Sequence, residues 1–288
     1  MNPEPLEQLS AAKPSYAPFV THLLWTAGWD STYRLLDLVI RRGREVAPHY
    51  IVDPGRPGTM QELLAMRAIR KRIAKEHPGR EQLIQPTRTT LLDSIEPNAE
   101  LTAKFERLKA RAYLGSQYDW LARYIHQHGI EQLELCIHAD DRAEGFVREF
   151  VEQVSLPDGD GYWQIRRDAS GGDIGLFAHF HFPILNLTKT EMRRAAVAAG
   201  FGRIMALTWF CHTPIGGRPC GVCNPCRYTI AEGLADRLPG RALLRNRFAS
   251  QMQLTRSVGR PVYKALAGIA KPLINRERRR RGVPAPKA

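Results

Sequence analysis

The 288-residue sequence lacks several features that would place it in a familiar class. It has no run of about 18 apolar residues, so no segment is expected to span a membrane. The first twenty residues carry prolines and acids where a signal peptide would have an apolar core. The P-loop pattern GxxxxGK[ST] is absent, and there is no internal repeat. We therefore expect a cytoplasmic protein that does not bind phosphate through a P-loop.

Acidic residues are almost missing from the last part of the chain. Residues 241–288 hold thirteen Lys or Arg and one acid, a net charge of +12, whereas the preceding 240 residues hold 29 basic and 28 acidic side chains. Such a basic tail could bind RNA phosphates or an anionic membrane surface, or it could be a solvated segment. The body of the protein is close to neutral, which argues against a basic binding face spread over the whole fold.

Apolar runs of strand length alternate with helical patterns along the middle of the chain. The expected strands are 20–26, 50–53, 82–85, 133–137 and 204–209. The expected helices are 31–42, 60–75, 101–128 in two pieces, and 188–199 after a Thr188–Glu191 capping box, whereas glycine-rich 155–175 is expected to be a loop. This alternation predicts an α/β fold with a Rossmann-like parallel sheet of about five strands. The predicted parts are an irregular arm (1–19), the α/β domain (20–210), a cysteine segment with a helix (211–240) and the basic tail (241–288).

A short segment between the first expected strand and helix has the composition of a phosphate-binding loop. Its candidate nucleotide-binding residues are Thr26, Ala27, Gly28, Trp29, Asp30, Ser31 and Thr32. Ligands of open α/β sheets bind at the carboxyl ends of the strands, and free amides at a helix start favour phosphate. The alternative is an ordinary strand-to-helix turn capped by Asp30 or Ser31.

Cysteine is scarce, but four of the five cysteines crowd into sixteen residues. Cys211, Cys220, Cys223 and Cys226 follow the pattern C-x8-C-x2-C-x2-C. Four thiolates make a closed tetrahedral zinc site, which would be structural because it leaves no position for water. An iron–sulfur cluster is the alternative, since Cys-x2-Cys-x2-Cys also occurs there. Cys136 lies in an apolar run and is expected to be a buried small residue.

The two motifs together resemble the 7-cyano-7-deazaguanine synthase family. Gly28, Asp30 and Ser31 match the family's Ser-Gly-Gly-x-Asp-Ser pyrophosphatase loop, with Ala27 replacing a glycine. The segments Asp53-Pro-Gly55, Leu187-Thr-Lys-Thr-Glu191 and Thr208-Trp-Phe-Cys211, and the four-cysteine spacing, also resemble the family's. The resemblance covers about residues 20–238 and implies the fold of adenine nucleotide alpha hydrolases.

The resemblance also implies a reaction. The family uses ATP and ammonia to convert a 7-carboxy-7-deazaguanine into the nitrile, through adenylylation, amide formation and dehydration. Carried over to this chain, it implies ATP and Mg²⁺ near Asp30 and Ser31, Zn²⁺ on the four cysteines, and a catalytic role for Asp30, Ser31 and Lys189. Asp53 could meet the ribose or adenine of ATP, although a turn before Pro54 explains it equally well.

The segments where the family holds its base differ in this chain, so the substrate could be a relative of the deazapurine carboxylate. Asp140 and Asp141 are candidates for magnesium or substrate contact, or for helix capping. His179 and His181 are expected on one side of a strand as partly buried histidines rather than as metal ligands. A tRNA-modifying sulfurtransferase and a non-catalytic nucleotide-binding partner are the alternative functions, and a homodimer is a further prediction.

Overall fold

The computed structural model describes residues 20–249, which fall into two compact units that divide between Phe210 and Cys211. The arm expected before residue 20 and the tail beyond residue 249 lie outside the described residues. Within 20–249, no helix combines the length and apolar character needed to cross a membrane.

The first unit is built on one seven-stranded sheet. Its strands are β1 (Thr21–Leu24), β2 (Val46–Val52), β3 (Arg88–Leu91), β4 (Leu133–Glu134), β5 (Val151–Ser155), β6 (Gly161–Ile165) and β7 (Phe180–Phe182). The spatial order is β3-β2-β1-β4-β7-β6-β5, in which the first five strands are parallel and β6 runs antiparallel to both neighbours. The prediction of an α/β fold with about five parallel strands is thus confirmed, although two of these strands, β3 and β7, lie outside the predicted runs and an antiparallel β5–β6 hairpin is added at one edge.

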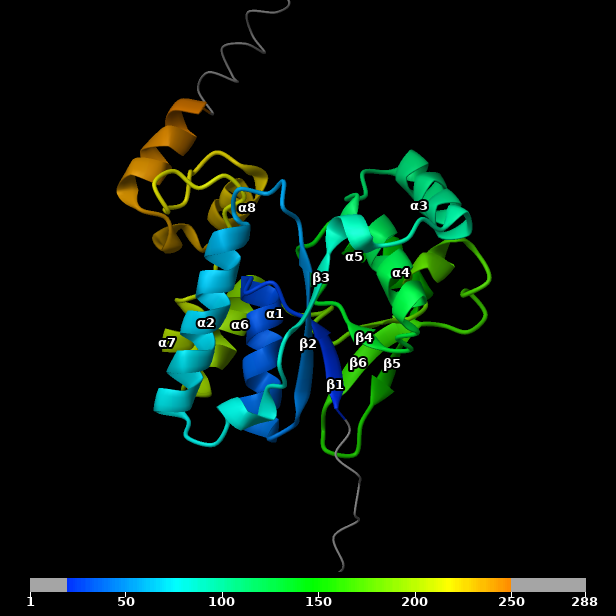
Figure 1. Ribbon diagram of the computed structural model, residues 1–288, viewed down its shortest axis with the longest axis horizontal. Helices are drawn as coiled ribbons and strands as arrows, with labels where there is room; N and C mark the ends of the chain where they lie inside the picture. The colour runs from blue at the N-terminus through cyan, green and yellow to red at the C-terminus, as the bar shows by residue number, and fades with distance from the viewer. Residues whose placement is uncertain (1–19, 250–288) are drawn as a thin grey trace, which may run out of the picture. The chain divides into compact units, whose positions relative to one another are not determined.

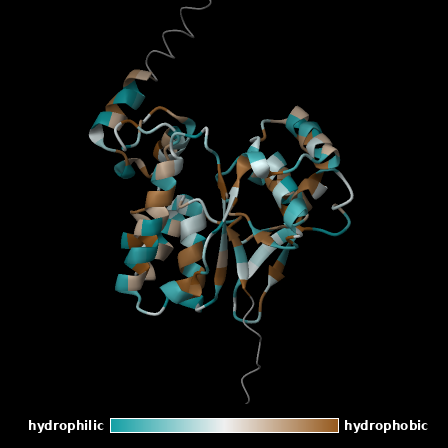
Figure 2. Ribbon diagram, viewed as in Figure 1, coloured by the Kyte–Doolittle hydropathy of each residue, from teal (hydrophilic) through white to brown (hydrophobic). Residues whose placement is uncertain are grey.

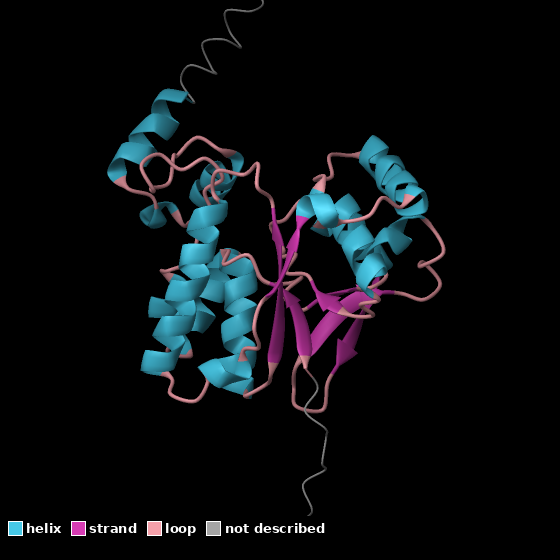
Figure 3. Ribbon diagram, viewed as in Figure 1, coloured by secondary structure: helices cyan, strands magenta, loops and turns pink. Residues whose placement is uncertain are grey.

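Helices cover both faces of this sheet, as the cyan and magenta ribbons of Figure 3 show. Figure 1 places α1 (Trp29–Leu36), α2 (Thr59–Glu76), α6 (Lys189–Ala198) and α7 (Gly202–Met205) on one face. The other face carries α3 (Ala99–Arg111), α4 (Gln117–His128) and the short α5 (Glu144–Val147). In Figure 2 the strands carry brown segments among white and teal ones. The inner strands β2 and β7 are mostly buried, whereas the edge strands β3 and β5 are largely exposed.

The order of the strands reverses between β1 and β4. From β1 the chain moves outward to β2 and β3, then returns to place β4 on the other side of β1, where Leu23 pairs with Glu134. A crevice opens at the carboxyl ends of two strands at such a switch point, because the connecting loops diverge there. The loop after β1 and the segment after β4 are therefore the expected walls of a ligand site.

Local signals explain the main helix boundaries. Thr188 forms the predicted capping box with Glu191, and the α6 helix ends before Gly200, which has φ +81°. The α1 helix continues as a π-helical segment, Asp37–Arg42, which Gly43 ends at φ +64°. The helices expected at 31–42, 60–75 and 188–199 and the two pieces of 101–128 are all present.

Two strand predictions and one loop prediction are wrong or displaced. The run 204–209 is not a strand, because Ile204 and Met205 are buried as part of the short helix α7, and β7 is the fifth parallel strand. At the run 82–85 the chain forms a 3-10 turn, Glu81–Leu83, followed by an isolated bridge at Ile84, and the third strand starts later, at Arg88. The expected loop 155–175 contains β6, because only residues 156–160, with Gly159 at φ +76°, form the turn that joins β5 to β6.

A buried ion network fastens α1 to the sheet. The Arg34 guanidinium, 3% exposed, donates to both oxygens of Glu134 on β4 at 2.6 and 2.7 Å. It also donates to both oxygens of Asp160, next to β6, at 3.0 and 2.9 Å. The paired carboxylates hold the pKa of Arg34 well above its usual value against the opposing effect of burial. Arg34 lies one turn after Asp30, so the network fixes the helix that follows the β1–α1 loop.

The second unit contains α8 (Asn224–Ala231) and a helix that begins at residue 240 and is described to 249. Arg245 on this helix donates to the carbonyl oxygens of Cys220, at 2.7 Å, and Pro219, at 3.2 Å. Asn246 donates to the carbonyl oxygen of Gly221 at 2.9 Å. The first described residues of the basic tail are therefore bound to the cysteine segment and are not a separate element.

Candidate functional site

The loop between β1 and α1 is held at both ends by hydrogen bonds. Trp25 N–H donates to the carbonyl of His49 on β2 at 2.9 Å, and its indole Nε1 donates to the Thr32 hydroxyl at 3.0 Å. Gly28 is the N-cap of α1, and its carbonyl accepts from Thr32 N–H at 3.1 Å. A Cβ at Gly28 would lie 3.2 Å from the Thr26 hydroxyl, so the glycine lets that hydroxyl lie close to the backbone.

Ala27 adopts the left-handed conformation that a glycine would favour. Its φ is +53°, and it is the one non-glycine residue of positive φ among residues 20–249. The side chain is fully buried, and its carbonyl accepts from Trp209 N–H at 2.9 Å. The loop therefore keeps a positive-φ backbone in spite of the replacement, at a cost of about 1–2 kcal/mol.

Two polar atoms of this loop are buried without partners. Asp30 Oδ1 and Ser31 Oγ have no hydrogen bond to any residue that the structure describes. A buried polar group left in this state costs about 1–3 kcal/mol. Both atoms belong to the first turn of α1, where the helix dipole and free amides favour an anion. They fit a ligand that brings phosphate oxygens to the hydroxyl and a cation or donor to the carboxylate.

Two further side chains meet Asp30 from distant parts of the sequence. Lys189 Nζ, from the first residue of α6, lies 3.7 Å from Asp30 Oδ2. His138 Nε2, from the segment after β4, lies 3.9 Å from the same oxygen. The structure thus brings the three predicted residues Asp30, Ser31 and Lys189 into one region at the switch point. His138 was missed by the sequence analysis, which chose Asp140 and Asp141 from the same segment, because no motif marks the histidine and the β1–β4 pairing is what places it beside Asp30.

Other residues that were predicted to bind the nucleotide make contacts within the protein. The Thr32 side chain is fully buried and accepts the Trp25 indole bond, and Trp29 is 6% exposed with the Arg193 guanidinium 5.8 Å from its ring centroid. Asp53 Oδ1 accepts from Gly55 N–H at 2.9 Å, which is the turn role. These contacts favour the structural alternative for Thr32 and Asp53.

The remaining candidates also have local partners. Asp141 Oδ1 accepts from Ala143 N–H at 2.9 Å in the turn before α5, whose N-cap is Ala143 with no side-chain cap bond, and Asp140 is exposed. His181, on β7, stacks on Tyr162 at 3.7 Å, and burial lowers its pKa to about 4. His179 is exposed and lies beside the Glu131 carbonyl. The two histidines therefore show no common metal site.

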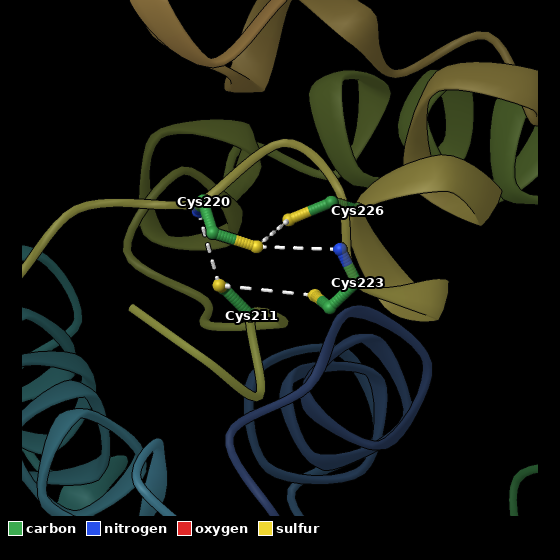
Figure 4. A group of neighbouring side chains, drawn as sticks. All are labelled: Cys211, Cys220, Cys223 and Cys226. Carbon is green, nitrogen blue, oxygen red and sulfur yellow. Dashed lines mark hydrogen bonds between the residues drawn. The ribbon is translucent and has the colours of Figure 1, made fainter. Parts of the chain in front are cut away.

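The four clustered cysteines converge on one point, as Figure 4 shows. Their Sγ atoms all lie within 4.8 Å of one another, and the pairs Cys220–Cys226 and Cys211–Cys223 are 3.9 Å apart. Four thiolates bound to one tetrahedral ion at about 2.3 Å would be separated by about 3.8 Å. The cluster therefore fits a single zinc ion, whereas an iron–sulfur cluster would hold its cysteines farther apart.

The backbone around the cysteines is arranged to support thiolates. Cys211 Sγ accepts from Cys220 N–H at 3.2 Å, and Cys226 Sγ accepts from Gly221 N–H at 3.3 Å. Contact with the Cys226 thiol lowers the pKa of Cys223 to about 4, whereas burial raises the pKa of Cys211 to about 11. Such N–H···S bonds orient metal-binding sulfurs and stabilise their charge.

Gly221 is required for this arrangement. Its φ is +86°, and a Cβ there would lie 2.1 Å from the carbonyl oxygen of Ala242. No L side chain fits this position without moving the backbone of the 240–249 helix. The glycine therefore lets the cysteine loop and that helix pack together.

The comparisons with known proteins agree with part of this picture. No family model matches the chain. A curated protein named 7-cyano-7-deazaguanine synthase 1, from Sphingopyxis alaskensis, is 31% identical over 109 residues, which are 38% of this chain and 42% of that protein. The match thus spans less than half of that relative's length. It supports the family resemblance drawn from the motifs.

A solved structure also overlaps with the chain. It is a 4-thiouridine synthetase in complex with RNA and bound ATP, with a TM-score of 0.33 and 14% sequence identity over 79% of this chain and 52% of that chain. An overlap this loose transfers no property of that protein to this chain.

Proposed function

We propose that this chain is an ATP-cleaving enzyme that activates a carboxylate and joins it to ammonia, as a 7-cyano-7-deazaguanine synthase does. The observation that carries the proposal is the β1–α1 loop at the switch point, with Asp30 Oδ1 and Ser31 Oγ buried and without described partners. The similarity to 7-cyano-7-deazaguanine synthase 1 points to the same chemistry. The substrate we propose is 7-carboxy-7-deazaguanine or a related deazapurine carboxylate.

The residues present fit the nucleotide and its ion. The hydroxyls of Thr26 and Ser31 and the amides after Gly28 would bind ATP phosphates, because they lie at the positive end of α1. Asp30 Oδ1 is a hard oxygen ligand of the kind that Mg²⁺ prefers, and Mg²⁺ would screen the negative charge of the triphosphate. Lys189 would stabilise charge that develops on the phosphates during transfer.

The proposed reaction consists of adenylylation of the carboxylate, amide formation and dehydration of the amide. A carboxylate oxygen attacks the α-phosphorus of ATP and pyrophosphate leaves, giving an acyl adenylate. Ammonia then attacks the acyl carbon, AMP leaves, and a proton is lost to give the amide. The amide oxygen then attacks the α-phosphorus of a second ATP and pyrophosphate leaves, and departure of AMP with the loss of both N–H protons leaves the nitrile. The loop residues act only by binding and orientation, because no side chain needs to form a bond to the substrate.

Sulfur transfer to tRNA is less well supported. A sulfurtransferase needs a reactive thiol outside the metal cluster, and Cys136 is the one cysteine left. Burial, with the nearby carboxylates of Glu134 and Asp30, raises the pKa of Cys136 well above its ordinary value. A thiol kept protonated is a poor nucleophile. The non-catalytic alternative is based on Ala27 and on the altered base segments. Of these two grounds, Ala27 is weakened because its backbone has a positive φ, as a glycine at this position could.

The test is product analysis with purified protein, Mg-ATP, ammonia and 7-carboxy-7-deazaguanine. We expect mass spectrometry to detect the amide or nitrile together with AMP. If ATP is cleaved only when a different carboxylate is supplied, the proposed substrate is wrong and the proposed class of reaction is supported. No cleavage with any carboxylate would favour the non-catalytic alternative. A tail contact with RNA or anionic lipid, and a homodimer, remain separate proposals.

A further inference from the structure

One oxygen of Asp30 is flanked by two donors, while the other oxygen has no partner. Lys189 Nζ and His138 Nε2 approach Oδ2 at 3.7 and 3.9 Å, and Oδ1 is buried without a hydrogen bond to any described residue. The two donors come from different elements, α6 and the segment after β4. The two oxygens of the carboxylate are therefore in different environments.

The ring of His138 is fixed by its own backbone. Its side chain is 4% exposed, and Nδ1 accepts from Asp140 N–H at 3.2 Å. Because Nδ1 is the acceptor, the neutral ring carries its proton on Nε2, the nitrogen that faces Asp30. The Nδ1 bond maintains the turn after β4, whereas Nε2 makes no hydrogen bond to any residue of 20–249.

We infer that His138 is a positioning residue for Asp30, whose Oδ2 it holds together with Lys189 so that Oδ1 stays turned toward the bound ion and phosphates. The inference rests on the proposed function for the identity of that ligand. At 3.9 Å the Nε2–Oδ2 contact is longer than a hydrogen bond, and such contacts often shorten when a ligand binds. His138 itself touches neither nucleotide nor acceptor.

Two substitutions distinguish the contribution of Nδ1 of His138 from that of Nε2. In His138→Asn the side-chain oxygen can take the place of Nδ1 and keep the Asp140 bond, but nothing reaches Asp30. In His138→Gln the longer amide can place a donor near the position of Nε2, but the Nδ1 bond is lost. A purely structural histidine would tolerate Asn better than Gln, whereas a positioning residue would tolerate Gln better than Asn. His179→Asn, at an exposed site beside β7, is the matched control.

The first measurement is Mg-ATP affinity by calorimetry, with thermal unfolding of each variant. We expect His138→Asn to weaken binding about tenfold, the effect of losing one charge-assisted bond, with Tm close to that of the wild type. We expect His138→Gln to stay within about threefold of the wild type, and His179→Asn to be unchanged. The inference is wrong if the two His138 variants bind Mg-ATP with equal affinity, or if the loss of affinity in each variant parallels a decrease in its Tm.

The second measurement does not depend on nucleotide. Long-range ¹H–¹⁵N spectra of the imidazoles should place the His138 proton on Nε2, and Asp30→Asn should shift that signal while the His179 signal stays unchanged. An unshifted His138 signal would overturn the inference regardless of what the chain binds. If the shift is present but the wild type binds no Mg-ATP, the nucleotide assignment falls and the coupling of His138 to Asp30 stands.

Discussion

The β1–α1 loop and the cysteine segment differ in how far their candidate ligand-binding atoms are already hydrogen-bonded. In the loop, Asp30 Oδ1 and Ser31 Oγ are buried without described partners and one alanine has a positive φ. In the cysteine segment, Cys211, Cys220 and Cys226 each accept at least one backbone N–H bond, and the four sulfurs already have the spacing of a single-ion site. The loop is suited to a ligand that enters and leaves, and the cysteines to one that stays.

Metal removal should have the largest effect, and it should be confined to one unit. Without the ion, four thiols would be crowded together with little apolar core around them, and structural zinc contributes on the order of 10 kcal/mol to such segments. We expect Cys211→Ser or chelation to remove hydrogen-exchange protection from residues 211–249 and to leave residues 20–210 protected. Cys136→Ser is the control. Protection that survives complete metal loss would show that the cysteine segment does not depend on the ion.

Removing Arg34 should be the most damaging change to the α/β unit. Arg34→Met would leave Glu134 and Asp160 buried without their main partner, at a cost of about 3–5 kcal/mol in the free energy of unfolding. Urea unfolding measures the loss. Arg41→Met is the matched control, because Arg41 pairs with Asp37 from a side chain that is 49% exposed. Similar losses in the two variants would mean that burial of the Arg34 network contributes little.

Lys189→Ala should separate the function of the loop from its stability. The lysine lies at the start of α6, and its ammonium is 3.7 Å from Asp30 Oδ2. We expect the rate of AMP formation to fall by about two orders of magnitude, equivalent to about 3 kcal/mol, while the free energy of unfolding changes little. Arg194→Ala, on the same helix, is the comparison. A rate within a few-fold of the wild type would remove Lys189 from the site.

Lowering the pH should reduce the free energy of unfolding of the α/β unit, because His49 is neutral when folded and becomes protonated on unfolding. Burial lowers the pKa of His49 to about 4, and the ring bonds His22 at 2.8 Å and Tyr124 at 2.6 Å. Because the unfolded histidine titrates near 6.5, its contribution is fully present above that pH and is lost as the pH falls toward 4. We expect a loss of about 2–3 kcal/mol over this range, which His49→Gln should reduce. Parallel pH profiles for the two proteins in urea titrations would contradict this assignment.

Ala27→Gly should give the smallest effect. Glycine relieves the left-handed conformation but adds entropy to the unfolded chain, so the free energy of unfolding should rise by no more than about 1 kcal/mol. ATP cleavage should stay the same, because the loop already has the required backbone. A large gain in activity would show that the alanine distorts the loop more than its φ indicates.

Sequence reasoning succeeded where the signal is local. The Thr188 capping box, the helix stop at Gly43 and the spacing of the cysteines are all contained in short segments, and the structure shows each of them. It failed in short apolar runs whose residues show no clear helical or strand periodicity, as at Ile204, which lies in a helix and not in a strand. Periodicity cannot separate these two cases in short apolar runs.

The candidate site shows the same limit. The residues of the β1–α1 loop are consecutive and could be named from the sequence, whereas His138 reaches Asp30 only because β4 pairs with β1. Likewise, the roles of Thr32 and Asp53 depend on which partners the fold brings to them. The Thr32 hydroxyl accepts from the Trp25 indole, a contact without a sequence signal of its own. For Asp53 the sequence left the turn role and the nucleotide contact equally open, and the bond from Gly55 N–H shows the turn role.

The most direct measurement is the nucleotide product of the purified protein with Mg-ATP, ammonia and 7-carboxy-7-deazaguanine. If the loop after β1 binds ATP for adenylylation, AMP and pyrophosphate should form in equal amounts, and Asp30→Asn should abolish both. Formation of ADP and phosphate in their place, or cleavage that is unaffected by Asp30→Asn, would contradict the assignment of this loop as the catalytic nucleotide site.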